Sequence, residues 1–144
     1  MVLRVGDVMT TFVEFIEPEA TVKEAAEMMG ELEVGALPAG SAARVEGVVT
    51  DRDILYRVVA AGLDPGRVRV RDVLSRPVIA CGEDETVQAA LDAMAANHIR
   101  RMPVQDAAGR VTGWVTLADL ARKLLVDSAT LQGALTELTD ADET

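Results

Sequence analysis

Two threonine–aspartate pairs have the residue types and the spacing of a site that binds an anion. Thr50 and Asp53 are three positions apart, as are Thr116 and Asp119, and each pair joins an apolar run to a helical pattern. At a junction between strand and helix, unpaired amides and the helix dipole favour an anion, and a hydroxyl can donate to a phosphate oxygen. The same spacing is typical of a helix N-cap. For one pair alone, the capping interpretation is favoured.

Arginines near these pairs could supply positive charge. Arg100 and Arg101 precede a predicted strand, and Arg52 lies inside the first threonine–aspartate pair. A guanidinium can hold two phosphate oxygens at once. For Arg52 alone, an exposed surface side chain is the favoured interpretation. For each residue of the Arg100–Arg101 pair, an exposed surface side chain is the alternative to a contact with a ligand.

Other chemistries find less support in the sequence. Asp51 and Asp53 could form a magnesium pair or an acid–base pair, but the second threonine–aspartate pair has Leu117 at the position of Asp51. One cysteine, Cys81, and one histidine, His98, do not make an ordinary structural zinc site. His98 could act as a pH sensor, but we favour its interpretation as a helix C-cap partner. The chain has no evident nucleophile–base pair and no Gly-rich phosphate loop, so we predict neither an enzyme nor a metal site.

Composition and charge limit the class of protein. The chain has 144 residues, 49% of them apolar and 3% aromatic, which indicates a globule with a core of Val, Leu, Ala and Met. It contains no apolar run long enough to span a membrane and no signal-peptide pattern, and a single cysteine fits a reducing cytoplasm. A net charge of −10 disfavours duplex nucleic acid as a partner. A small anion in a local basic pocket remains possible.

The elements that must position these residues occur twice. The second copy follows the first by 65 positions up to Pro38, and by 66 positions from Gly47 onward. The difference of one residue falls in a small-residue stretch, 39–43, which we interpret as a surface turn. Two copies in register indicate one duplicated supersecondary unit. Function is therefore expected in what the copies share, or in the cleft where they meet.

Each copy is predicted to fold as β-α-β-β-α. Thr21 and Glu24 have the spacing of a capping box, Thr86 opens the corresponding helix, and Gly62 suits a helix end. Neither three-stranded sheet has enough apolar cover alone, so we expect the two units to pack as one α/β (α+β) module. The predicted strands are 12–16, 36–39, 45–50, 78–81, 102–105 and 111–116, and the predicted helices are 22–32, 51–61, one opening at Thr86, and 117–126.

The same periodicity divides the chain into four parts. We predict a first repeat over 1–63, a linker over 64–69, a second repeat over 70–126 and a C-terminal tail over 127–144. The tail has a weak helical pattern followed by an acidic end, and we expect it to be partly helical or disordered. A frayed tail is favoured over a helix that packs on a partner subunit.

Taken together, the repeated features resemble the CBS domain, which is named for cystathionine β-synthase and normally occurs in pairs. The resemblance rests on the opening Val5–Met9 and Val70–Leu74, the Thr-Val helix starts, the Leu/Met-Pro strands and the two Gly-x-x-Thr-x-x-Asp segments. It covers about residues 5–61 and 70–126. It implies a pseudo-two-fold, disc-like pair that often forms homodimers. It also implies a regulatory protein that binds AMP, ADP, ATP or S-adenosylmethionine between the repeats, with no obligatory cofactor.

The resemblance also implies a set of ligand-binding residues. In the family, the threonine reaches a phosphate, the aspartate binds the vicinal ribose hydroxyls, and basic residues at the strand entrance often reach phosphates. Ala39, where the family usually has valine, could loosen an adenine slot in the first copy. We therefore expect one occupied site or two sites of unequal affinity. The predicted set is Thr50, Arg52, Asp53, Val78, Arg100, Arg101, Pro103, Thr116 and Asp119.

Two functional hypotheses follow. In the first, an adenine nucleotide binds between the repeats, changes the geometry of a dimer and so modulates a partner protein in trans. In the second, the chain is a structural, oligomerisation or protein-interaction module whose clefts are vestigial and unoccupied. Failure of every nucleotide to bind would favour the second.

Overall fold

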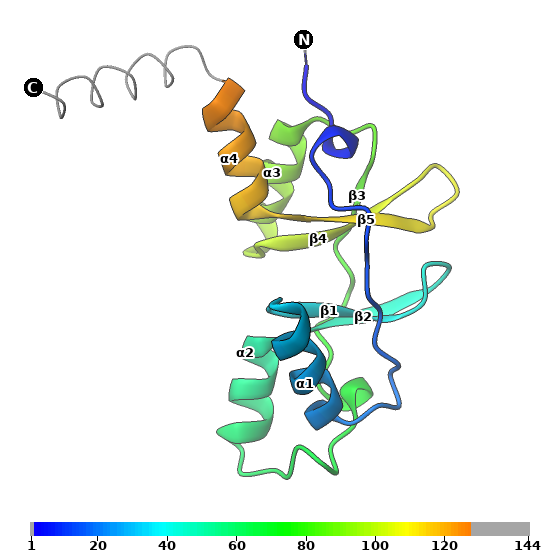
Figure 1. Cartoon of the computed structure of the whole chain (residues 1–144), viewed down its shortest axis with the longest axis vertical. Helices are drawn as coiled ribbons and strands as arrows, with labels where there is room; N and C mark the ends of the chain where they lie inside the picture. Colours follow the sequence, from blue (N-terminus) through cyan, green and yellow to red (C-terminus); the bar gives the residue numbers. More distant parts are fainter. Residues whose placement is uncertain (1, 128–144) are drawn as a thin grey trace, which may run out of the picture.

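The computed structural model describes residues 2–127, which form two similar halves (Figure 1). In each half a small sheet lies toward the middle of the molecule, and two helices lie on its outer side. The prediction of a mixed α/β pair is therefore confirmed. The prediction for the tail lies outside the described residues, apart from Asp127, which ends the last helix.

The first half begins with helix α1, Val22–Leu32. Its capping box is formed as predicted, because Thr21 Oγ1 accepts from the amide of Glu24 and the Glu24 carboxylate accepts from the amide of Thr21. Strands β1, Ala36–Gly40, and β2, Val45–Thr50, pair antiparallel. Helix α2, Asp51–Ile54, continues as a π-helical turn, Leu55–Val59, rather than as the regular helix predicted over 51–61. Gly62, at φ +72°, follows this segment.

The second half repeats this arrangement. Helix α3, Val87–Asn97, is capped by Thr86, whose hydroxyl oxygen accepts from the amide of Ala89. Strand β4, Arg101–Gln105, lies between β3, Cys81–Gly82, with which it is parallel, and β5, Val111–Thr116, with which it is antiparallel. Helix α4, Leu117–Asp127, closes the described chain. None of the helices described is long and apolar enough to cross a membrane.

Two predicted strands are wrong. Residues 12–16 form no strand, since only Ile16 makes an isolated bridge, to Ala39, and the first sheet has two strands. Residues 78–80 are also irregular, so that β3 starts only at Cys81. The physical reason is the path of the chain. Thr10 pairs with Trp114 in the second half, so the residues that follow must cross to the first half before they can pair there.

The opening segments of the two repeats are exchanged between the halves. Val5 is buried in the core of the second half, with Val87, Met102 and others. Its counterpart Val70 is buried in the core of the first half, where Val73 and Leu74 accompany it. The amide and carbonyl of Ser75 bond to Val48 in β2, and those of Thr10 bond to Trp114 in β5. The sequence repeats and the structural halves are thus different divisions of the chain.

Candidate functional site

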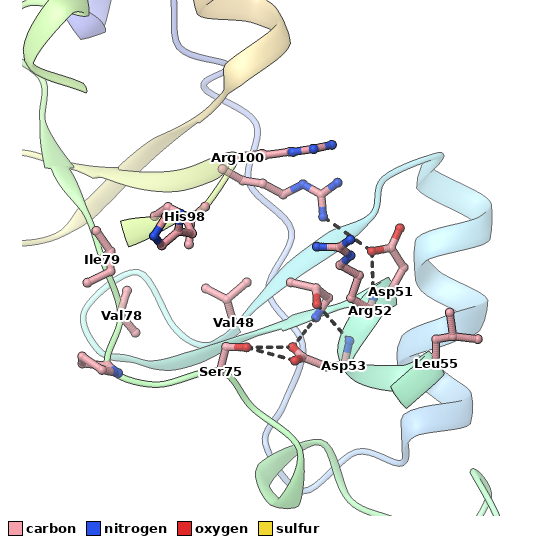
Figure 2. A pocket seen from close by; sticks show the side chains of 14 residues that line it. Val48, Asp51, Arg52, Asp53, Leu55, Ser75, Val78, Ile79, His98 and Arg100 are labelled. Atoms are coloured by element: carbon pink, nitrogen blue, oxygen red, sulfur yellow. Dashed lines mark hydrogen bonds and ion pairs between the residues drawn. The ribbon is translucent and has the colours of Figure 1, made fainter. Parts of the chain in front are cut away.

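A cavity of about 700 Å³ lies between the two halves (Figure 2). One wall comes from the end of β2 and the start of α2, and the others come from the segment after Leu74 and from the turn between α3 and β4. Its volume falls within the range of pockets that hold small ligands. The lining residues are Val48, Thr50, Asp51, Arg52, Asp53, Leu55, Ser75, Pro77, Val78, Ile79, His98, Ile99, Arg100 and Arg101.

Thr50 and Asp53 form a complete capping box in this wall. The amide of Asp53 donates to Thr50 Oγ1 at 3.1 Å, and the amide of Thr50 donates to Asp53 Oδ2 at 2.9 Å. The next amide, that of Arg52, donates to Asp51 Oδ1 at 2.9 Å. Because side chains already satisfy these amides, the backbone at this junction has little left to offer a phosphate. Anion binding here must depend on side chains.

The Asp53 carboxylate is almost fully buried and has a second partner. Its residue is 8% exposed, and the Ser75 hydroxyl lies 3.0 Å from both of its oxygens (Figure 2). Arg57 Nε approaches Asp53 Oδ1 at 3.8 Å from the next helical turn. These contacts fix the orientation of the carboxylate and partly compensate its burial.

Three arginines bring positive charge to the cavity. Within residues 2–127, the guanidinium groups of Arg52 and Arg100 form no hydrogen bond and no ion pair. Arg101 crosses from the second half to the first, where its Nη1 donates to the carbonyl of Gly35 at 2.8 Å and lies 3.8 Å from Asp51 Oδ1. Figure 2 shows Asp51, Arg52 and Asp53 opposite His98 and Arg100. The cavity therefore has two guanidiniums whose donors are uncommitted.

Six of the nine predicted site residues line this cavity. They are Thr50, Arg52, Asp53, Val78, Arg100 and Arg101. Pro103 does not line it, since it is buried in β4 opposite Trp114. Thr116 and Asp119 are also absent from its wall.

Thr116 and Asp119 lie at the corresponding junction of the second half. The amide of Asp119 donates to Thr116 Oγ1 at 3.2 Å, and Arg122 pairs with the Asp119 carboxylate at 3.3 Å. Ala39, which was expected to loosen an adenine site, does not line this cavity, because it is fully buried in the core of the first half.

The two junctions differ in charge although the scaffold is repeated. Val48, which lines the cavity, is replaced by the larger Trp114 in the other copy. The positions of the three cavity arginines are held there by residues without charge. In the order Arg52, Arg100 and Arg101, the counterparts are Ala118, Gly35 and Ala36. The first junction therefore carries more positive charge than the second.

Sequence reasoning missed several cavity residues. Ser75 is the most important of them. The only feature of the sequence that singles it out is its correspondence to Thr10, and both residues pair with a strand of the opposite half. His98 was not among the predicted site residues. It is the C-cap of α3, with a left-handed φ of 54°, and its residue also lines the cavity. No group of three His, Cys, Asp or Glu side chains within residues 2–127 could hold a metal ion.

Comparison with known proteins finds consistent relatives. The family model described as "CBS domain" matches residues 5–60 and 70–126. The CBS domain-containing protein YhcV of Bacillus subtilis is 38% identical over 117 residues, which are 81% of this chain and 82% of that protein. Hypoxic response protein 1 of Mycobacterium tuberculosis is 35% identical over 119 residues, 82% of each chain.

Solved structures share the fold. A crystal structure of Hypoxic Response Protein I with two coordinated zinc ions has a TM-score of 0.74 and 34% identity, and covers 83% of this chain and 97% of that one. The CBS domain pair of protein MJ0100, in complex with 5′-methylthioadenosine and S-adenosyl-L-methionine, has a TM-score of 0.79 and 24% identity. It covers 89% of this chain and all of that one.

Proposed function

Because this chain belongs to the CBS domain family, we propose that it is a regulatory module that binds an adenosine-containing nucleotide, of the AMP, ADP or ATP class, between its two halves. A bound nucleotide would modulate a partner protein in trans. The observation that carries the proposal is the meeting, in one cavity, of Thr50 and Asp53 from the first half with Arg100 and Arg101 from the second.

The lining suggests how a nucleotide would lie. Thr50 Oγ1 accepts a hydrogen bond from a backbone amide, so its own proton remains available to a phosphate oxygen. The unpaired guanidiniums of Arg52 and Arg100 can take further phosphate oxygens. Asp53 keeps acceptor capacity for ribose hydroxyls beside its bonds to Thr50 and Ser75. Val48, Ile79 and Ile99 supply apolar wall for a base.

The ligand class rests on this cavity and not on the solved neighbours. The complex with S-adenosyl-L-methionine supports the fold, and the zinc ions belong to the hypoxic response protein. S-adenosylmethionine itself is a weaker candidate here, because its cationic sulfonium would meet three arginines. The proposal assigns a regulatory role, without catalysis, and a cytoplasmic location.

A homodimer forms part of the same proposal. The π-helical turn after α2 exposes Tyr56 and Val59, and the end of α4 exposes Leu125 and Val126. In Figure 1 both helices lie toward the same side of the molecule. Large exposed apolar side chains on one side of a molecule are typical of a protein–protein contact. Light scattering with and without nucleotide measures the mass and any change in it.

Calorimetric titration with AMP, ADP, ATP and S-adenosylmethionine tests the proposal. We expect saturable binding of at least one phosphorylated nucleotide, and a loss of about tenfold or more in affinity for Arg100→Gln, because a hydrogen bond to a charged group is removed. Arg110→Gln is the matched control, since Arg110 is exposed in the β4–β5 turn and does not line the cavity. Asp119→Ala should also bind normally.

Absence of binding would change the conclusion. If none of the four compounds binds to folded protein freed of co-purified nucleotide, the structural or protein-interaction module becomes the better description. If Asp119→Ala weakens binding while Arg100→Gln does not, the ligand occupies the second junction rather than this cavity.

A further inference from the structure

Arg101 differs from the other two cavity arginines in being held. Its guanidinium donates to the Gly35 carbonyl at 2.8 Å and lies 3.8 Å from Asp51 Oδ1. The side chain of Arg101 is 31% exposed and that of Asp51 63%, so the pair sits at the mouth of the cavity and is partly screened by solvent. Both side chains also line the cavity. An anion that enters therefore meets Arg101 with a carboxylate already beside it.

Gly35 provides the space in which this pair forms. A Cβ atom at position 35 would lie 2.8 Å from Arg101 Nη2 and 2.9 Å from Asp51 Oδ2. The Gly35 carbonyl also accepts from the amide of Asp51, at 2.9 Å. Three groups from two halves of the molecule thus converge on one glycine. The contact joins the halves, because Gly35 and Asp51 belong to the first and Arg101 to the second.

Asp51 is not required by the repeated scaffold. Its counterpart in the second copy is Leu117, and the counterpart of Arg101 is Ala36. Thr50 already supplies the cap of α2. The Asp51 side chain adds to the helix itself only a hydrogen bond that it accepts from the amide of Arg52. A carboxylate at the mouth of a cavity with three arginines opposes the binding of an anion.

We propose that Asp51 is an internal counter-anion that holds Arg101 against Gly35 and lowers the affinity of the cavity for anionic ligands. A phosphate group that engages Arg101 replaces the Asp51 carboxylate, and the link of Arg101 to the first half is released in the same step. Asp51 thereby sets the ligand concentration at which the contact of Arg101 with Gly35 is released. This inference rests on the proposed function, since it requires that the cavity takes an anion.

Two variants test the pair by independent routes. Asp51→Asn removes the charge but keeps an oxygen that can accept from the amide of Arg52. Gly35→Ala keeps every charge but displaces the pair, and it is tolerable because the atoms it meets end flexible side chains and φ at Gly35 is not left-handed. Both should raise the affinity for ATP and for inorganic tripolyphosphate by about two- to fivefold at low salt, the range expected for a partly exposed ion pair.

The controls separate this effect from general electrostatics. Asp84→Asn removes the same charge at an exposed position that does not line the cavity. The affinity of this variant for ATP and for tripolyphosphate should equal that of the wild type. In the double variant Asp51→Asn/Arg101→Gln, the gain from Asp51→Asn should disappear, because Asp51 acts through Arg101. The gain should also shrink as salt screens the pair.

The outcomes distinguish this inference from the proposed function. If ATP binds equally well to the wild type, Asp51→Asn and Gly35→Ala, the nucleotide site stands and the counter-anion is refuted. If Asp51→Asn lowers the affinity for ATP only in the presence of Mg²⁺, Asp51 binds the magnesium ion instead, and the inference is also refuted. If tripolyphosphate gains affinity in both variants while no nucleotide binds better than tripolyphosphate, the counter-anion stands and the nucleotide proposal fails. If no anion binds any variant, both fail.

Discussion

Asp53 caps α2 with a carboxylate that keeps acceptor capacity for a ligand. Its carboxylate accepts from the Thr50 amide and the Ser75 hydroxyl, and a carboxylate offers about four lone-pair sites. Capping therefore does not exclude a ribose. It does make Asp53→Ala a poor test of binding, since the cap and the partner of Ser75 would be lost together. Arg100, whose guanidinium has no partner within residues 2–127, is the cleaner residue to change.

Cys81 leads to a prediction about alkaline pH. The thiol is buried in the second core, and burial, with a smaller contribution from the charge of Glu85, raises its pKa to about 11. An unfolded thiol has a pKa of about 8.5. Between these values the unfolded chain loses a proton that the folded chain keeps, so the free energy of unfolding falls as pH rises. The expected loss is about 2–3 kcal/mol by pH 11.

Urea unfolding from pH 6 to pH 11, compared with Cys81→Ala, measures this loss. The variant lacks the thiol, so its stability should decline less steeply over the same range, while the two curves run parallel below pH 8. Parallel curves throughout would show that the thiol does not contribute. In the wild type, reaction with a thiol reagent at pH 8 should be slow until the protein unfolds.

At the scale of elements, a glycine in β2 and its counterpart in β5 allow another segment to cross. A Cβ atom at Gly47 would lie 2.9 Å from Leu74 Cβ and 3.0 Å from the Ser75 carbonyl oxygen. At Gly113, it would collide with Met9. The exchanged opening segments thus run directly over these strands. The glycine of the repeated motif is explained by this close approach rather than by a turn.

Gly47→Ala should consequently destabilise the protein by about 1–3 kcal/mol, because backbone must move to admit the methyl group. Gly30→Ala is the matched control. Gly30 is exposed in α1, and a Cβ atom there meets nothing within 4 Å. Its substitution should stabilise the helix by about 0.5–1 kcal/mol. Chemical denaturation of both variants measures the difference between their free energies of unfolding. Equal changes in the two variants would contradict the role of Gly47 in admitting the crossing segment.

Local patterns in the sequence predicted most helices and strands, but they could not predict which distant segments pair with each other. The capping box at Thr21, the helix start at Thr86 and the hairpins of β1–β2 and β4–β5 depend on residues close in the chain. The failure at 12–16 has a different origin, because a strand also needs a partner and the chain there is crossing between halves. For the same reason Ser75 was missed. Arg100 and Arg101, which were predicted from their charge together with the family resemblance, do line the cavity.

At the scale of the whole molecule, the exchange of opening segments makes the two halves depend on each other. Val70 belongs to the second sequence repeat and is fully buried in the first core, and Val5 shows the reverse. A change in either segment must therefore act on the half that is formed mainly by the other sequence repeat. This arrangement also places the connection through Ser75 beside Asp53, so that the wall of the cavity and the core of the first half share one segment.

Val70→Ala and Val5→Ala form a matched pair that tests this arrangement in the intact chain. Each removes the same two methyl groups from a buried site, and each should cost about 2 kcal/mol. Hydrogen exchange measured by mass spectrometry should show faster exchange in α1, β1 and β2 for Val70→Ala, and in α3, β4 and β5 for Val5→Ala, because local opening follows the weakened core. Faster exchange within each variant's own sequence repeat would contradict the exchange of segments. Identical patterns in both variants would mean that the halves open only together, so that a ligand between them would act on the molecule as a single unit.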